Sequence, residues 1–463
     1  MSNSADLIVL GAGPAGLAAA WRASRAGLSV TVLERTEAVG GMAASFDVAG
    51  VRVDHGSHRL HPSTAPAILA DLQGLLGDDL QLRRRHGRLH VAGRWVGFPL
   101  RPAELARTLP AGMLARVGAE ALAEPLRRGR PSSYADALRR GLGRTLYDEL
   151  YGPFAVKLWG RTGDEIDAEQ ARVRVSADTP WKIARRMLRR SAKGPGKAFH
   201  YPRRGFGQIV DAVADAATAA GAELRLGAEV DQLRAGEDGV AVRAGDGTIF
   251  TAEHLFTTIP LPVLARLTEP PAPPAAVEAA ARLRFRAMVL VYLVHEGRPW
   301  TEFDATYLPD ASTPVARISE PANYRSSADD PRDRTVLCCE LPCEVGDQWW
   351  RASDGELAEL VADTLAHFDL PPLRLAGVQV RRLPTVYPVY EIGYAEHLRG
   401  LDAWAGALPR VTTFGRLGLF AHDNTHHAIA RAYDAVDALA GGRWDAAAWS
   451  AARRRFADHV VED

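Results

Sequence analysis

The chain has 463 residues, and its 56 Lys and Arg side chains balance its 56 Asp and Glu side chains, so its formal net charge is zero. Hydrophobic residues make up 47% and charged residues 24%, which is typical of a globular protein and excludes a mainly disordered chain. A neutral chain has no overall attraction for nucleic acid, so we expect a small-molecule partner. The length predicts two or three folding units.

The three cysteines, Cys338, Cys339 and Cys343, lie close together in the sequence. Their C-C-x3-C spacing matches no known zinc pattern, and three thiols cannot form a full disulfide framework. We therefore predict no metal site, a buried strand around these residues, and a reducing compartment.

An uncharged apolar stretch, residues 7–21, could be mistaken for a signal peptide or a membrane span. It follows Asp6 rather than a basic segment, it is interrupted by glycines and a proline, and it is too short to cross a bilayer. The expectation is a cytoplasmic protein.

The first strong motif is a glycine turn between an apolar strand and a helix. Residues 7–10 predict a buried parallel strand, residues 17–26 a helix, and residues 29–33 a second strand that ends at Glu34. The turn itself has the G-x-G-x-x-G spacing and reads Gly11, Ala12, Gly13, Pro14, Ala15, Gly16. This order of elements is typical of a dinucleotide-binding unit.

Each part of the motif has a physical role. Gly11 allows the tight turn, Gly13 lets the backbone approach a pyrophosphate, and Gly16 lets the helix pack closely on the strand. The helix N-terminus offers free N–H groups to the phosphates. Glu34 can accept hydrogen bonds from a ribose diol and would repel a 2′-phosphate, which leaves NAD or FAD. Arg35 follows directly and is assigned to the same cofactor site.

A second glycine pair, Gly40 and Gly41, distinguishes FAD from NAD as the expected cofactor. With the first motif, it resembles the FAD domain of glutathione-reductase-type flavoproteins, including amine oxidases, phytoene desaturases, protoporphyrinogen oxidases and UDP-galactopyranose mutases. The resemblance implies FAD, with the pair near its diphosphate. Many of these relatives have Arg after the pair, whereas this chain has Met42.

The loop after the third predicted strand carries two histidines. Its residues Gly56, Ser57, His58, Arg59, Leu60 and His61 resemble G-P-H-I-F-H of the mutases and G-G-H-R-F of bacterial protoporphyrinogen-oxidase-like proteins. The resemblance implies that Gly56 and Ser57 pass beside the isoalloxazine. It makes His58 a candidate catalytic proton acceptor, since histidine titrates near neutrality. Arg59 and His61 become candidate substrate-binding residues.

Further substrate-binding candidates also come from the mutase resemblance. Lys157 and Trp159 lie in a segment that is similar to a P-Y/F-x-x-K-x-W-G motif. Arg172 and Arg174 resemble an arginine-containing stretch that follows it, and we select Arg172, although the mutase spacing is not reproduced. Tyr387 resembles a Y-P motif at the substrate diphosphate. Arginine suits a diphosphate because its fork donates paired hydrogen bonds.

Two later segments resemble FAD-contacting parts of the same superfamily. Val230 corresponds to a strand residue whose backbone closes over the adenine. Gly415 and Arg416 belong to a G-R-L-G motif found in the mutases and the protoporphyrinogen-oxidase-like proteins. A helix that begins near residues 423–425 and includes Ala428 would direct its N–H groups at the flavin.

The resemblance implies an α/β fold with a Rossmann-like FAD-binding domain of glutathione-reductase type and an inserted α+β substrate domain. We expect the FAD-binding domain to be discontinuous and to comprise residues 1–62, 200–262 and 405–463. The substrate domain would then comprise residues 63–199 and 263–404.

Two enzyme functions stay open. The first is an FAD-dependent, amine oxidase-like oxidoreductase in which an amine, alcohol or sugar-derived metabolite gives hydride to flavin N5. The second is a non-redox, mutase-like enzyme in which reduced FAD acts on a nucleotide sugar. The loop sequence at Ser57–Arg59 and the spacing at Arg172 depart from the mutases and favour the first. Substrate, electron acceptor and oligomeric state are not determined by the sequence.

The neutral total conceals a basic segment between Thr179 and Val210, which has no Asp or Glu. It contains nine basic residues: Lys182, Arg185, Arg186, Arg189, Arg190, Lys193, Lys197, Arg203 and Arg204. Three interpretations are a lid that attracts an anionic substrate, a helix that contacts a membrane surface, and a solvated helix face.

Overall fold

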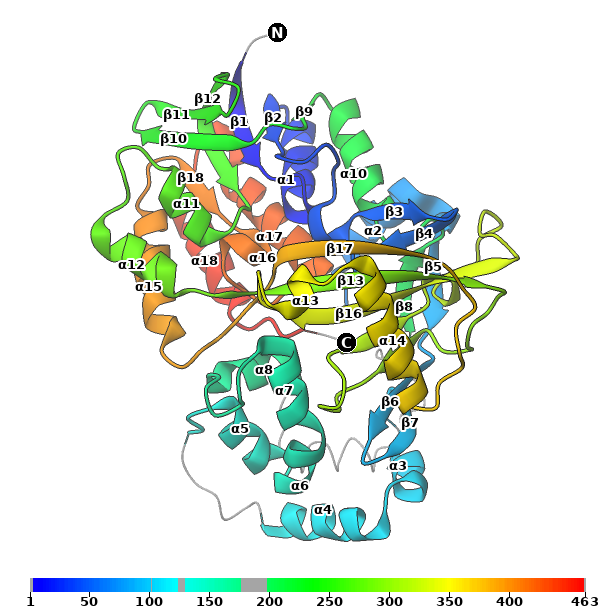
Figure 1. Ribbon diagram of the computed structural model, residues 1–463. Coiled ribbons are helices and arrows are strands. Elements are labelled where there is room, and N and C mark those ends of the chain that lie inside the picture. Colours follow the sequence, from blue (N-terminus) through cyan, green and yellow to red (C-terminus); the bar gives the residue numbers. More distant parts are fainter. Residues whose placement is uncertain (1–2, 101, 124–129, 176–197, 462–463) are drawn as a thin grey trace.

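The computed structural model describes residues 3–100, 102–123, 130–175 and 198–461, and two seven-stranded sheets organise them (Figure 1). Residues 179–197, most of the basic segment, lie outside the described residues. Within the described part, none of the helices combines the length and the apolar character needed to cross a membrane.

The first sheet combines parallel strands from both ends of the chain with an antiparallel meander. Its strand order is β10-β11-β12-β1-β2-β9, and β18 also pairs with β12. β9, β2, β1, β12 and β18 are parallel neighbours, whereas β10, β11 and β12 are antiparallel. The bounds are β1 (Ser4–Leu10), β2 (Val30–Leu33), β9 (Glu223–Arg225), β10 (Val230–Gly236), β11 (Gly239–Ala244), β12 (Ile249–Thr257) and β18 (Val411–Thr413).

The second half of β1, residues 7–10, is apolar because both faces of the sheet are covered there. Leu7 and Val9 join a core with helices α1 (Pro14–Arg25), α10 (Gln208–Ala219) and α17 (Thr425–Ala438) on one face, and Ile8 and Leu10 join a second core on the other. A strand buried on both sides needs a continuous apolar run, which is why the sequence predicted it. The second core is formed with α11 (Leu261–Leu267), α12 (Pro274–Arg282) and α15 (Tyr394–Gly406).

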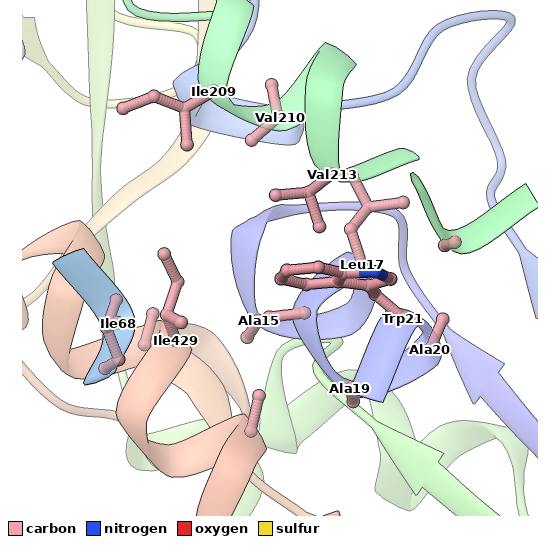
Figure 2. Close-up of a cluster of buried hydrophobic side chains, with 14 of the residues drawn as sticks. Ala15, Leu17, Ala19, Ala20, Trp21, Ile68, Ile209, Val210, Val213 and Ile429 are labelled. Atoms are coloured by element: carbon pink, nitrogen blue, oxygen red, sulfur yellow. The ribbon is translucent and has the colours of Figure 1, made fainter. Parts of the chain in front are cut away.

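Helix α1 is the centre of the first core. It lies between α10 (Gln208–Ala219) and α17 (Thr425–Ala438), and its alanines allow both helices to approach closely. Figure 2 shows side chains of these helices and of α2 (Pro66–Leu76) turned toward one another around Trp21. Each fully buried Leu, Ile or Val in such a core contributes roughly 1.5–3 kcal/mol.

The second sheet has the order β17-β13-β16-β15-β14-β6-β7. Alternate residues of its long central strand β13 face a core beneath α13 and α14 or a core against β3 and β4. The strand bounds are β6 (Gly87–Val91), β7 (Arg94–Phe98), β13 (Phe285–Glu296), β14 (Ala305–Tyr307), β15 (Arg317–Ser319), β16 (Arg334–Cys343) and β17 (Leu375–Pro388). All three cysteines are free and buried on β16, so the predicted buried strand is confirmed.

The remaining elements surround these sheets, and a helical group lies below the second sheet in Figure 1. That group comprises α3 (Pro102–Thr108), α4 (Ala111–Ala123), α5 (Tyr134–Gly141), α6 (Arg144–Leu146), a π-helical turn (Tyr147–Tyr151), α7 (Gly152–Trp159) and α8 (Ala168–Val175). Two small sheets pair β3 (Ser45–Val48) with β4 (Val51–Asp54) and β5 (Leu80–Arg84) with β8 (Ala198–Pro202). The other helices are α13 (Gln348–Arg351), α14 (Asp354–His367), α16 (Gly415–Gly418) and α18 (Ala446–Phe456).

The glycine turn after β1 is tighter than the sequence alone indicated, because α1 (Pro14–Arg25) begins at Pro14 rather than near Leu17. Gly16 therefore lies in the first turn of α1. A Cβ at this position would lie 1.9 Å from the carbonyl oxygen of Gly11, well inside van der Waals contact.

Gly16→Ala is expected to lower the free energy of unfolding by roughly 3 kcal/mol or more, because backbone rather than a flexible side chain must move. Thermal and urea unfolding of the purified protein measure this loss. Gly74→Ala in α2 is the matched control, since a Cβ there meets no atom within 4 Å. The control should be neutral or stabilising by up to ~1 kcal/mol. Equal melting temperatures for the two variants would contradict the prediction.

Candidate functional site

Three glycine segments from distant parts of the sequence meet beyond the carboxyl end of β1. The Gly40 N–H donates to the Ala12 carbonyl at 2.7 Å. A Cβ at Gly41 would lie 3.5 Å from Gly13 Cα, and one at Gly415 would lie 3.2 Å from Ala15 Cβ. We call this group, residues 11–16 with Gly40, Gly41 and Gly415, the glycine cradle.

Two features of the cradle's geometry fit a bound dinucleotide. A Cβ at Gly13 would meet no atom within 4 Å, so this stretch of backbone faces open space at the start of α1. Glu34 lies beside it at the end of β2, where its Oε2 accepts the Ala12 N–H at 2.9 Å. Open backbone at a helix N-terminus with a carboxylate at the next strand end is the arrangement that binds a diphosphate and a ribose.

The other predicted cofactor residues differ in their surroundings and in how exposed they are. Val230 begins β10, and Ala228 just before it donates its N–H to the Glu34 carbonyl at 2.8 Å. Met42 packs against the core beneath β3 and β4, and Arg35 is exposed. Ala428 lies buried in the first turns of α17, whose N-cap is Asn424, within the predicted start at residues 423–425.

The loop predicted to contact the isoalloxazine is fixed from both sides. His55 Nδ1 lies 3.2 Å from the Gly41 carbonyl oxygen, which ties the loop to the cradle. The Ser57 N–H donates to Glu340 Oε1 on β16 at 2.8 Å. Ser57 Oγ also hydrogen bonds to the Tyr324 hydroxyl. Gly56 turns between these contacts with φ +90°, a conformation that favours glycine.

Glu340 is itself held by a buried ion pair. Arg317 on β15 donates from Nη2 to both carboxylate oxygens, at 2.7 and 2.8 Å, and from Nε to Oε1 at 3.0 Å. The two side chains are 17% and 6% exposed. Burial alone would lower the pKa of Arg317, but Glu340 and neighbouring tyrosines raise it well above its ordinary value. Arg317 therefore stays charged, and its contacts with Glu340 fix the position of Ser57 relative to the second sheet.

His58 has the protonation state that a proton acceptor needs. Its ring stacks on Phe206 with 5.3 Å between centroids, and its Nε2 lies 3.1 Å from the His55 carbonyl oxygen. Burial lowers the pKa of His58, against an opposite effect of Asp54, so the ring is neutral at pH 7. Because Nε2 faces a carbonyl, it carries the proton, and the lone pair is on Nδ1.

Arg59 is a buried, paired cation. It donates to Asp304 Oδ1 at 3.1 Å and to the Tyr307 hydroxyl at 3.3 Å, and its guanidinium lies over the rings of Phe199 and Tyr324. The carboxylate of Asp304 already balances its charge, so Arg59 offers an anion less than its sequence position suggested.

A less compensated positive region surrounds Tyr387. The guanidinium of Arg416 lies 4.9 Å from the centre of its ring and that of Arg174 lies 5.4 Å from it, while His422 stacks on it at 6.2 Å. We call these four residues the arginine–tyrosine cluster. Among the described residues, no carboxylate forms an ion pair with Arg416 or Arg174.

Arg416 shows the strongest need for a ligand. Its Nε and Nη2 are buried without a hydrogen-bond partner in the described part of the chain. Burial lowers the pKa of Arg416 from its ordinary value, since the nearby groups do not compensate for the loss of solvent. Unsatisfied buried donors cost free energy, and an anion placed here would recover it. Arg416 follows Gly415, so these unsatisfied donors lie next to the glycine cradle.

Four predicted substrate residues have other partners. All three protons of Lys157 Nζ are used by the carbonyls of Leu308, Asp310 and Val315, at 2.5, 2.6 and 3.0 Å. Trp159 is 3% exposed and packs edge-on against Tyr134.

Arg172 faces away from the arginine–tyrosine cluster. It pairs with Glu169 on the surface of α8 and donates to the Ala457 carbonyl at 2.8 Å. His61 is 5% exposed, with Nδ1 2.6 Å from Ser63 Oγ, and stacks on His426. These contacts give the first two residues a role in the fold, Arg172 a role in holding the C-terminal segment, and His61 a place in a separate histidine group. Their contact with a substrate stays a prediction.

Sequence reasoning missed Arg317, Tyr324 and His422, because short motifs cannot reveal side chains that a second sheet or a distant loop brings in. Arg174 was recognised but not selected. Helical spacing could have distinguished the two arginines. The residues on either side of Arg174, Val173 and Val175, are buried or half-buried, whereas Arg172 is exposed.

Glu340→Gln is expected to destabilise the protein by about 3–5 kcal/mol, because it leaves Arg317 buried without its counter-charge. Urea unfolding measures the change. Asp333→Asn is the control, since its pair with Arg334 is solvent-exposed, and it should change stability little. A loss no larger than that of the control would show that the buried pair does not hold the loop.

Acid is expected to destabilise the protein through His422. Burial, followed by the charges of Arg174 and Arg416, lowers the pKa of this ring well below its ordinary value. Below about pH 6.5 the unfolded chain therefore binds a proton that the folded chain does not, and stability falls by up to ~1.4 kcal/mol per pH unit. His422→Gln should flatten this slope in urea titrations between about pH 7 and pH 5. Identical slopes would contradict the assignment.

Comparison with known proteins agrees with this geometry. Residues 14–411 match the family model described as flavin containing amine oxidoreductase. A coproporphyrinogen III oxidase of Propionibacterium freudenreichii subsp. freudenreichii is 25% identical over 461 residues, covering 87% of this chain and 84% of that protein.

Solved structures show the same fold at lower identity. A reduced UDP-galactopyranose mutase superposes with a TM-score of 0.82 at 20% identity, covering 99% of this chain and 100% of the other. Cyclohexylamine oxidase from Brevibacterium oxydans IH-35A superposes with a TM-score of 0.68 at 17% identity, covering 94% and 98%. With the family model spanning most of the sequence, the chain belongs to the flavin-containing amine oxidoreductase family.

Proposed function

We propose that this FAD flavoprotein is an oxidoreductase that removes hydride from a C–H bond of a small anionic metabolite. The observation that carries the anionic part is Arg416, whose buried guanidinium has two donors without partners, with Arg174 beside it and no carboxylate paired to either in the described residues. A protonated amine would be repelled at this place, whereas a carboxylate or phosphate would be attracted. The relative named coproporphyrinogen III oxidase adds support for a substrate other than a simple amine.

The glycine cradle and its neighbours would hold FAD, and bound FAD supplies the hydride acceptor at N5. The residues proposed for this role are Gly11, Gly13, Pro14, Ala15, Gly16, Glu34, Arg35, Gly40, Gly41, Met42, Gly56, Ser57, Val230, Gly415, Arg416 and Ala428. Their arrangement supports a discontinuous FAD-binding domain of glutathione-reductase type, built on residues 1–62, 200–262 and 405–463. Since α2, α11, α12 and α15 pack into the two cores of the first sheet, we add these helices to the same domain. The rest of residues 63–199 and 263–404 would then form the substrate domain.

The protein's own groups position the substrate and accept a proton. Neutral His58, with its lone pair on Nδ1, would take the proton that leaves with hydride. Ser57, fixed by Glu340, keeps the loop in place beside it. Arg174, Tyr387 and the side chain of Arg416 would bind the anionic end of the substrate, and the backbone of Arg416 beside Gly415 would contact FAD. Arg59, neutralised by Asp304, would shape the wall of the site.

A mutase-like, non-redox reaction is the second candidate. The same arginine–tyrosine cluster could accept the diphosphate of a nucleotide sugar, which is the observation in its favour. The surface position of Arg172 is against it, since the mutase resemblance had assigned that arginine to the substrate.

One experiment separates these functions. Oxidised, FAD-loaded protein is mixed without oxygen with coproporphyrinogen III, which carries carboxylates, or with cyclohexylamine, and the flavin absorbance is recorded. We expect bleaching by the carboxylated substrate and none by the amine. Bleaching by the amine alone would overturn the anionic assignment. Isomerisation of UDP-galactopyranose only after dithionite reduction, with no bleaching by either compound, would favour the second candidate.

Arg174→Gln tests the cluster directly. The variant is expected to raise KM for the anionic substrate roughly tenfold, because one charge-assisted hydrogen bond is lost. FAD content and kcat should change little. Arg172→Gln is the matched control, two residues away on the same helix but paired at the surface, and its KM should equal that of the unmodified protein. Equal KM values for the two variants would refute the role of Arg174.

A further inference from the structure

A group of histidines lies apart from the arginine–tyrosine cluster, at the start of α17. It surrounds a cavity of about 370 Å³ that is bounded by the beginning of α2, the first turns of α17 and the tail that follows α18. The lining residues used below are Ser63, His426, His427, Asp458 and His459. Neither proposed reaction uses this cavity.

Two histidines that line this cavity and one nearby carboxylate present metal-binding atoms to one another. Asp423, His427 and His459 each offer one ligand atom, and these atoms all lie within 4.8 Å of one another. Asp423 and His427 come from the start of α17, whereas His459 comes from the tail, so two separate segments supply the set. The rings of His427 and His459 stack with 4.3 Å between their centres and 22° between their planes, so a side-chain rotation must turn both lone pairs toward a shared ion.

Asp423 and His459 have polar atoms without the partners that such buried atoms normally have, whereas His427 Nδ1 accepts the Asn424 N–H at 3.4 Å and leaves Nε2 for a ligand. His459 Nδ1 is buried with no hydrogen bond in the described part of the chain, and neither carboxylate oxygen of Asp423 accepts one there. Asp423 is 7% exposed. Its contact is an ion pair, with Arg431 Nη1 2.7 Å from Oδ2. An imidazole nitrogen without a hydrogen-bond partner therefore lies near a carboxylate that accepts no hydrogen bond. Because buried polar atoms normally have partners, this indicates that a further group binds between them.

The charges around the group allow one added cation. Arg431 is in contact with Asp423 and Arg416 also acts on it, while the negative side chains that act on His459 are Asp423, Asp434 and Asp458. Asp434 is engaged by Arg455 at 2.7 Å. Asp458 lines the cavity itself, so a carboxylate remains to offset the charge of a bound ion.

The geometry points to a binding site for one divalent first-row transition metal ion, with Asp423, His427 and His459 as its protein ligands. Imidazole with one carboxylate is a ligand set that Zn²⁺ accepts, whereas Mg²⁺ prefers oxygen ligands alone. Metal–ligand bonds of about 2.0–2.2 Å require the donor atoms to close by roughly 1 Å, which side-chain rotation can supply. The cavity leaves room for a water molecule as the fourth ligand.

A bound ion would join the C-terminal tail to the start of α17. The first turn of that helix is also the part assigned to the flavin, so the site would stabilise the helix end on which the cofactor depends. We predicted no metal site from the sequence because the cysteines were the candidate ligands. The histidine set is assembled only by folding, and its members have no recognisable zinc spacing.

The test uses tag-free, FAD-loaded protein, stripped with a chelator and desalted. Zn²⁺ is added, and the bound metal is measured by calorimetry and by elemental analysis after gel filtration, with the melting temperature as a second readout. We expect one Zn²⁺ per chain, a higher melting temperature, and no effect of Mg²⁺ at the same concentration. Absence of stoichiometric Zn²⁺, or equal binding of Mg²⁺, overturns the proposal.

Variants place the ion. His459→Gln is expected to lose at least tenfold in Zn²⁺ affinity together with the rise in melting temperature, and His427→Gln should do the same. His367→Gln, an exposed histidine at the end of α14, is the control and should bind like the unmodified protein. FAD absorbance and circular dichroism check that each variant is folded. If His427→Gln does not fold, His459→Gln decides alone, and unchanged affinity in it refutes the site.

Discussion

The contact between Gly16 and the backbone of Gly11 is the constraint on which the rest of the structure depends. A Cβ at residue 16 would lie 1.9 Å from a carbonyl oxygen, so α1 can pack this closely against the end of β1 only if residue 16 is glycine. That approach sets where the helix N-terminus points. It also leaves Gly13 facing open space and lets Gly41 and Gly415 come against the same turn. The helices α10 and α17 then pack on α1 at distances that its alanines allow.

The cradle could be read from the sequence because its determinants are local. Gly11, Gly13, Gly16 and Glu34 act through backbone geometry within one strand-turn-helix-strand unit, and the structure confirms the strands and the helix. The glycine pair at residues 40–41 could be recognised for the same reason. The substrate side could not be read in this way, because Arg317, Tyr324 and His422 come together through the second sheet and a distant loop. Residue spacing along the chain carries no record of those contacts.

Arg172 and Arg174 show where motif reasoning loses resolution. Both lie on α8, and two residues of helix separate a guanidinium that pairs with Glu169 at the surface from one that lies over Tyr387. A helix turns by 100° per residue, so neighbouring arginines face different surroundings. Local charge therefore identified the helix that reaches the arginine–tyrosine cluster but not which of its two arginines does so. The same distinction separates Arg59, neutralised by Asp304, from Arg416, which has no carboxylate paired to it among the described residues.

The pairing of β12 with β18, and the contact of Gly415 with Ala15, also have a consequence for biosynthesis. Since Gly415 lies 400 residues after Ala15, the turn that begins the cradle leaves the ribosome long before the segment that closes it. Until then, one face of α1 lacks α17, and the apolar residues around Trp21 stay accessible to solvent. Contacts of such long sequence separation slow folding and expose nascent chains to aggregation. Expression yield should therefore depend on chaperones that protect the region of α1 until α17 is made.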